Sequence, residues 1–155
     1  MKFWGSTLVL LIAFAVPAAA FASAGAETVH FGGSLTQATT NPCTGAPGTE
    51  SVTFKGVAHT SVSANGSMHH TATVTGEILF VPDDSSQPTY IGKFTAWDGQ
   101  NALGATITST AAFHTTLTGS DGSRISNRGV FHVTLLEDGT VTAAVDKFTF
   151  VCETG

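Results

Sequence analysis

The segment 111–131 reads AAFHTTLTGSDGSRISNRGVF and predicts two β-strands joined by a tight turn. Ser120-Asp121-Gly122 has the composition of a three-residue hairpin loop, in which glycine takes the left-handed position that closes the turn. With a loop of that length Leu117 faces Ile125, so apolar side chains meet across the two strands. The segment therefore predicts an antiparallel hairpin with one apolar face.

Two further turns have the same signature and lead to the same result. Ala64-Asn65-Gly66 and Glu137-Asp138-Gly139 each lie between runs in which apolar and polar residues alternate. A two-residue loop at the first turn would pair Val62 with His69, which belong to opposite faces. Three-residue loops instead predict these pairs: Val62 with Met68, Ala58 with Ala72, Ala111 with Phe131, Leu135 with Val141, and Val133 with Ala143.

Thr, Val, Phe and Ile alternate with polar residues along most of the chain, and no stretch has apolar residues at helical spacing. The connections between these runs, such as 82–88 and Asp98-Gly99-Gln100-Asn101, are hairpin-like and too short for parallel crossovers. The sequence predicts an all-β, mainly antiparallel meander with strands near 27–39, 50–63, 67–81, 89–97, 103–118, 123–136 and 140–152.

The predicted apolar face has no helix to cover it, so the sheet must close on itself or fold into a sandwich. Successive hairpins favour a single up-and-down, calycin-like β-barrel of seven or eight strands. Phe148 and Phe150 differ in parity from Val141 and Ala143, which predicts a β-bulge near Asp146-Lys147. The predicted face comprises Phe54, Ala58, Val62, Ala72, Val74, Ile78, Phe80, Phe94, Ile107, Phe113, Leu117, Ile125, Phe131, Val133 and Leu135.

Residues 1–26 have the features of a secretory signal peptide: a positive start, the apolar run 8–16, and small residues before the cleavage site. Both Ala22-Ser23-Ala24 and Ala24-Gly25-Ala26 are A-x-A sites, and we favour the second. The mature protein is then a single secreted domain of residues 27–155 with no membrane span. An uncleaved anchor is the alternative, although the apolar stretch is shorter than the ~20 residues that a span needs.

Cys43 and Cys152 are the two cysteines, and an even pair in an exported protein predicts a disulfide. Neither lies in a C-x-x-C motif, so a redox motif and a zinc knuckle both lack their spacing. In a meander of seven strands the first and last strands run in the same direction. Their ends, where the cysteines lie, should therefore meet at one pole.

Charged residues make up only 11% of the chain, which has a net charge of −5. Loss of Lys2 with the signal peptide makes the charge one unit more negative. Nucleic-acid binding needs a basic surface for phosphates, and this balance argues strongly against it. No motif calls for a cofactor, and we predict none.

The six histidines are the residues most suggestive of chemistry. His69 and His70 point to opposite faces of one strand, and the hairpin register places His114 beside Arg128, a poor neighbour for a bound cation. The sequence lacks both H-E-x-x-H and H-x-H, and no metal site is predicted. We favour exposed histidines on a Thr-rich face, with metal binding and acid–base catalysis as alternatives. Four of the six histidines have the parity of the polar face: His59, His69, His114 and His132. The other two histidines are His30 and His70.

Catalytic motifs are absent from the sequence. Covalent catalysis lacks a G-x-S-x-G motif, and the cysteines are predicted to be paired. Glycoside hydrolysis needs two converging carboxylates, whereas Glu77 is the only acid in a strand interior apart from Asp146 beside the predicted bulge, and it should face solvent. Asp83-Asp84 lacks the spacing of a calcium loop and predicts a turn. No catalytic residue is therefore predicted.

Tyr90, Phe94 and Trp97 lie on one predicted strand, with Trp97 at its end, next to the mouth of the barrel. Aromatic side chains at such a mouth can hold a ligand, or they can simply close the end of the core. With Phe113 and Phe131 of the apolar face, these three residues form the predicted ligand-binding set.

Several short motifs together resemble a group of small exported bacterial β-barrel proteins. The resemblance covers most of residues 41–152 and implies export and a barrel, but brings no established activity. Lipocalins are similar in shape only, because their G-x-W motif belongs on the first strand and Ala96-Trp97-Asp98 lies in mid-chain. The motifs are Asn41-Pro42-Cys43, Gly119-Ser120-Asp121-Gly122-Ser123-Arg124, His132-Val133-Thr134, Asp138-Gly139-Thr140-Val141-Thr142 and the terminal Cys152.

These observations predict a secreted, non-enzymatic barrel that binds a small apolar molecule or an extracellular partner. The first alternative is a cyclase- or isomerase-type enzyme at the barrel mouth, with a histidine or Glu77 as base, which requires titratable side chains that point inward. The second alternative is a structural, surface-associated protein whose Thr-rich outer face makes repeated contacts.

Overall fold

The computed structural model describes residues 25–104, 106–136 and 138–155, and the side chains of 142–146 lie outside that description. Residues 1–24 of the predicted signal peptide lie outside the described part. Its last two residues, Gly25 and Ala26, begin the first strand. The strands are β1 (Gly25–Thr40), β2 (Pro47–Val62), β3 (Met68–Pro82), β4 (Tyr90–Leu103), β5 (Thr106–Gly119), β6 (Arg124–Leu135) and β7 (Val141–Glu153).

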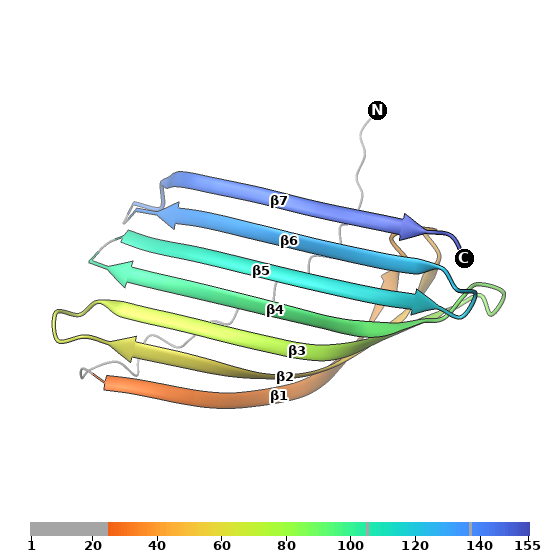
Figure 1. Ribbon diagram of the computed structural model, residues 1–155, viewed down its shortest axis with the longest axis horizontal. Helices are drawn as coiled ribbons and strands as arrows, with labels where there is room; N and C mark the ends of the chain where they lie inside the picture. The colour runs from red at the N-terminus through yellow and green to blue at the C-terminus, as the bar shows by residue number, and fades with distance from the viewer. Residues whose placement is uncertain (1–24, 105, 137) are drawn as a thin grey trace.

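The seven strands form one antiparallel sheet in chain order, which confirms the all-β meander (Figure 1). β1 and β7 are the edges, and among the described residues each pairs with a single neighbour, so the sheet is curled but not closed into a barrel. With seven strands both edges run in the same direction. Closure would therefore need a parallel ladder in a sheet that is otherwise built from antiparallel hairpins.

Two of the three predicted hairpin loops are confirmed in full, and the third agrees in its described residues Asp138 and Gly139, while Glu137 lies outside the described part. Gly66, Gly122 and Gly139 have φ angles of 81°, 86° and 79°, the left-handed conformation that closes a three-residue loop. The resulting register pairs Val62 with Met68, Leu117 with Ile125, Ala111 with Phe131, and Leu135 with Val141, as predicted.

Two sequence predictions about strand limits and register are wrong. Asp98-Gly99-Gln100-Asn101 is not a turn, because β4 continues through it to Leu103 and pairs with β3 along its whole length. The register shift in the last hairpin lies between Thr134 and Leu135 rather than near Asp146-Lys147, so Val133 pairs with Ala144 and not with Ala143. This shift close to the turn is sufficient to place Phe148 and Phe150 on the inner face.

Alternate residues divide the sheet into two faces. We call the face that carries Val52 and every residue of the predicted apolar face the inner face, and the opposite one the outer face. The inner face forms the core, and the edge-strand residues Phe31 and Phe150 both pack against it. The buried core residues are Val52, Val74, Ile78, Phe80, Tyr90, Phe94, Leu117 and Ile125.

The sheet has two ends of different construction. The disulfide end holds the β1–β2, β3–β4 and β5–β6 connections and the C-terminus, and the open end holds the β2–β3, β4–β5 and β6–β7 turns. Most buried core residues belong to the disulfide end. At the open end Ile107 is 42% exposed and Val141 54% exposed, although both belong to the inner face.

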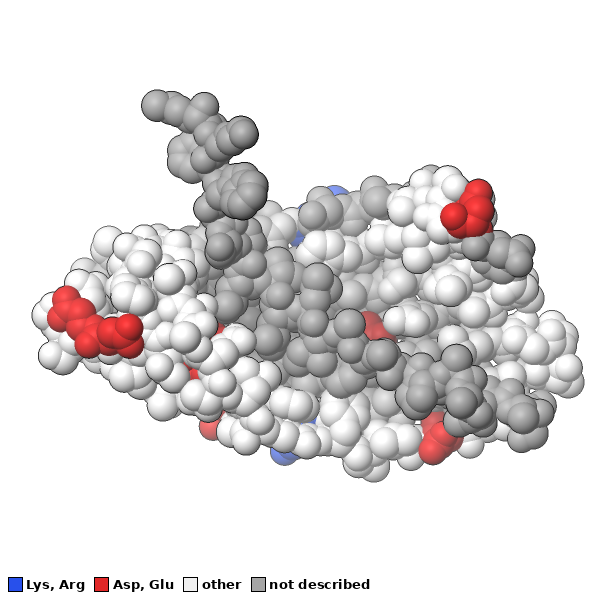
Figure 2. Space-filling model, turned by 180° about the vertical axis from the view of Figure 1, so that it is seen from behind, with Lys and Arg blue, Asp and Glu red and all other residues white. Residues whose placement is uncertain are grey.

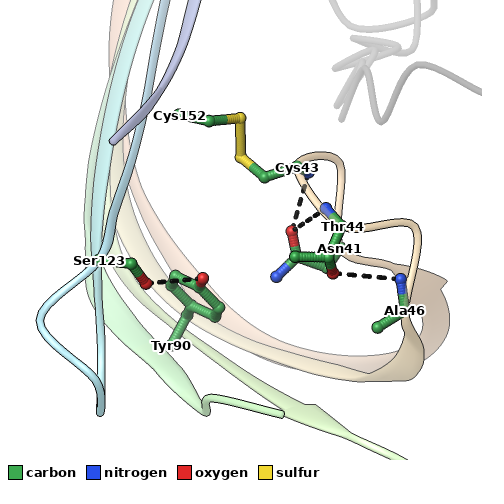
Figure 3. The surroundings of a disulfide bond; sticks show 7 residues. All are labelled: Asn41, Cys43, Thr44, Ala46, Tyr90, Ser123 and Cys152. Carbon is green, nitrogen blue, oxygen red and sulfur yellow. Dashed lines mark hydrogen bonds between the residues drawn. A yellow bond between two sulfur atoms is a disulfide. The ribbon is translucent and has the colours of Figure 1, made fainter. Parts of the chain in front are cut away.

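The predicted Cys43–Cys152 disulfide is confirmed and joins the β1–β2 loop to the end of β7 (Figure 3). The buried Asn41 shapes the loop, because its Oδ1 accepts hydrogen bonds from the backbone N–H groups of Cys43 and Thr44 at 2.8 and 3.3 Å. The bridge spans a sequence separation of 109 residues and links the two edge regions of the sheet. A disulfide of this kind is consistent with an oxidising compartment.

Candidate ligand-binding face

Four phenylalanines from three neighbouring strands form an aromatic cluster on the inner face. The Phe113 and Phe131 rings are stacked with centroids 5.9 Å apart, and the Phe148 ring lies 6.1 Å from Phe113 and 6.4 Å from Phe150. Gly129 stands between them in register, and a Cβ atom there would collide with the Phe113 ring. Phe148 remains 43% exposed, so the cluster presents aromatic surface that the core does not cover.

A polar group lies on the same inner face, across β2, β3 and β4. His70 is 4% exposed, and a hydrogen bond of 2.8 Å joins its Nδ1 to Thr60 Oγ1. Its Nε2 lies 4.0 Å from Asp98 Oδ2, too far for a hydrogen bond, and has no hydrogen-bond partner among the described residues. Burial raises the pKa of the Asp98 carboxyl, and the nearby His70 charge opposes that rise.

Asn127 provides a second buried polar atom without a partner in the described part of the chain, its Oδ1. Its register neighbours are Thr115 on β5 and Phe150 on β7, so it borders the aromatic cluster on the side of the disulfide end. An unpaired buried polar atom costs about 1–3 kcal/mol, and native proteins normally satisfy such atoms with water or a ligand. The inner face therefore offers hydrogen-bonding positions on both sides of the Phe113–Phe148 pair.

The five residues of the predicted ligand-binding set do not lie together. Phe113 and Phe131 meet in the aromatic cluster, whereas Tyr90 and Phe94 are 3% and 7% exposed and belong to the closed core. Tyr90 Oη hydrogen-bonds Ser123 Oγ at 2.8 Å, which anchors the ring at the disulfide end (Figure 3). Trp97 has the opposite parity and lies on the outer face in mid-strand rather than at a mouth, because β4 continues past it.

The histidines divide as the parity argument predicts, with one consequence that the sequence analysis missed. His59, His69 and His114 are exposed on the outer face, and His114 pairs with Arg128. Glu77 is also exposed there, so the base proposed for an enzyme points away from the inner face. His70 has the same parity as Ala72 and Val74, which predicts that it points inward. Its neighbour Asp98 could not be predicted there, because the composition of 98–101 indicates a turn.

Glu50 is a second inward carboxylate, at the disulfide end. It is 4% exposed, and its Oε1 accepts a hydrogen bond of 3.1 Å from Gln37 Nε2 on β1. Burial raises the pKa of the Glu50 carboxyl, and the hydrogen bond from Gln37 partly offsets that rise. Glu50 lies beside Phe80 in register, within the closed core, and so it contributes to the fold rather than to the open surface.

Within the described residues no three His, Cys, Asp or Glu side chains come together as a metal site. The same part of the chain contains no helix long and apolar enough to cross a membrane. No family model, curated protein or solved structure matches this chain. The inner face itself must therefore carry the functional argument.

Proposed function

We propose that this protein is an exported binding protein that holds a small, mainly apolar molecule on the inner face of its curled sheet. The observation that carries the proposal is that one face holds both the partly exposed aromatic cluster and two unpaired buried polar atoms, His70 Nε2 and Asn127 Oδ1. Ligand sites typically combine a largely apolar lining with a few fixed polar groups. The ligand class that fits is an apolar molecule with a hydroxyl or carbonyl group.

Closure of the sheet into a barrel is part of this proposal. The disulfide tethers the edge regions at one end, and Phe31 of β1 and Phe150 of β7 both pack on the core. We propose that the ligand completes the open end, entering past Ile107 and Val141 and covering their exposed surface. Export through cleavage after Ala26 belongs to the same proposal, and N-terminal sequencing of the protein from culture medium should begin at Glu27.

A dye titration tests the binding proposal. Nile red, an uncharged dye that fluoresces on apolar protein surfaces, should bind the disulfide-bonded protein. Phe113→Ala should weaken binding about tenfold, because a partly buried aromatic side chain is worth on the order of 1.5 kcal/mol. Ile91→Ala, which truncates an exposed apolar side chain on the outer face, is the control and should leave the titration unchanged. Equal effects of the two variants, or no dye binding at all, would overturn the proposal.

The buried His70, with the partly buried Asp98 carboxylate 4.0 Å from its Nε2, favours one second candidate, an isomerase-type enzyme. An imidazole close to a carboxylate is a common setting for a general base. The alternative predicts that the molecule recovered with His70→Gln is an isomer of the one recovered with the wild type, separable by chromatography at equal mass. Identical molecules from both proteins would support binding without catalysis.

A further inference from the structure

The outer face holds all five Lys and Arg residues among the described side chains. Their register positions on β2, β4, β6 and β7 all have outer-face parity, and none forms an ion pair with a described residue. Glu77 and Glu153 are the described strand carboxylates on that face, whereas Glu50 and Asp98 point inward. Figure 2 shows the molecule from behind, and Lys and Arg appear in this view only as small blue areas near the upper and lower borders of the described surface. In a chain of net charge −5, a basic outer face is a marked segregation of charge. The five residues are Lys55, Lys93, Arg124, Arg128 and Lys147.

A groove of about 760 Å³ crosses this basic face, and we call it the outer groove. Most of its lining residues belong to two adjacent cross-strand rows, one with Trp97, Val130 and Lys147 and one with His114 and Arg128. Ala96, Phe113 and Gly129, which have inner-face parity, complete the lining. The rows reach from β3 to β7, four strand spacings or about 19 Å. Neither row contains a carboxylate at any strand, so the groove is lined by hydroxyl, apolar and cationic groups.

Trp97 provides a flat apolar surface within the outer groove. Its ring lies against the sheet over Gly99, since a Cβ atom on Gly99 would approach Trp97 Cη2 to 2.8 Å. The residue is nevertheless 42% exposed, so part of the ring faces solvent. A ring supported in this way is already ordered, and stacking on it costs little conformational entropy.

We propose that the outer groove binds an acidic polysaccharide as an extended chain, with sugar rings stacked on Trp97 and uronate carboxylates paired with Arg128 and Lys147. Charge complementarity selects an anionic occupant, because both cations lack a carboxylate partner among the described residues. An open groove across five strands suits a linear polymer better than an enclosed small molecule. Threonines in both rows, such as Thr73 and Thr149, add hydroxyl partners for sugar oxygens.

The test is the mobility of the disulfide-bonded protein, expressed from the full chain in a secreting host, in native gels cast with polygalacturonate. The wild type should be retarded at low salt in these gels and not in gels cast with dextran, a neutral glucan. Arg128→Gln with Lys147→Gln should lower the affinity about tenfold, and so should Trp97→Ala. The loss of affinity on adding salt should be smaller for the double variant, since it has fewer ionic contacts.

Two control variants test whether a loss of affinity comes from the groove or from the overall charge and apolar surface of the protein. Lys93→Gln with Arg124→Gln removes the same charge from the same face outside the groove, and Ile91→Ala removes an exposed apolar side chain from the same strand as Trp97. Each control should change the affinity less than about twofold. A loss equal to that of the groove variants would overturn the proposal, and so would absence of retardation. Binding to oligothymidylate or phosphatidylglycerol vesicles without binding to polygalacturonate would also overturn it and assign the groove to that class.

Discussion

At the disulfide end of the sheet Val52, Phe80 and Tyr90 are at most 4% exposed, whereas at the open end Ile107 and Val141 are 42% and 54% exposed. Both sets belong to the inner face of the sheet, so the alternation of apolar and polar residues alone does not explain the difference. The disulfide brings the edge regions together at one end only. At the other end β1 and β7 run in parallel, and no ladder or disulfide among the described residues joins them. The closed core lies at the disulfide end, whereas the open end leaves inner-face apolar surface uncovered.

Removing the disulfide should have the largest effect on this contrast. The chain-entropy estimate for a loop of this length is about 4–5 kcal/mol, an upper value in practice. We expect Cys43→Ser with Cys152→Ser to lower the free energy of unfolding by up to that amount and to increase exposure of the disulfide end. Denaturant unfolding with fluorescence and circular dichroism measures it, and the reduced wild type should behave in the same way. A loss below about 1 kcal/mol would mean that the core holds the edges without the bridge.

The second largest effect is expected when one inner-face side chain is truncated at each end of the sheet and the losses in unfolding free energy are compared. Phe80→Ala removes a core side chain that is 4% exposed and should cost about 3–5 kcal/mol. Ile107→Ala removes an inner-face side chain that is 42% exposed and should cost less than about 1 kcal/mol. Equal losses in denaturant unfolding would show that the open end is closed in solution and would remove the distinction between the ends.

The smallest expected effect is a pH dependence at the disulfide end. Burial raises the pKa of Glu50 above its ordinary value of 4.5, so its stabilising contribution is present below that pH and is lost as the pH rises through the folded-state pKa. Glu50→Gln should therefore be more stable than the wild type at pH 7, with the difference vanishing near pH 4. Glu77→Gln, on the exposed outer face, is the control and should show no such trend. Thermal unfolding against pH measures both, and a constant Glu50→Gln difference would contradict the role of burial.

The fold could be predicted from the sequence wherever turn chemistry and alternation agreed. Gly66, Gly122 and Gly139 fixed the length of three loops, and each loop length fixed the pairing next to it. The prediction failed at Asp98-Gly99-Gln100-Asn101, whose composition is that of a turn but whose conformation is set by pairing with β3. Long-range pairing overrides local preference at such a site.

The candidate site was predictable only in part, for the same reason. Phe113 and Phe131 followed from parity, and the structure brings them together. The predicted fourth strand ends at Trp97, which puts that residue at a barrel mouth and assigns Asp98 to a turn. The sequence therefore predicts neither the proximity of Asp98 to His70 nor the outer groove. Whether the edges of the sheet meet depends on β1 and β7, which are far apart in sequence and share no turn.

Native mass spectrometry of the disulfide-bonded protein recovered from a host that exports it tests the central claim most directly. The wild type should carry a constant additional mass, which organic extraction removes and which Phe113→Ala retains to a lesser extent. A bare chain, two hydrogens lighter than the reduced protein in every preparation, would contradict a ligand on the inner face.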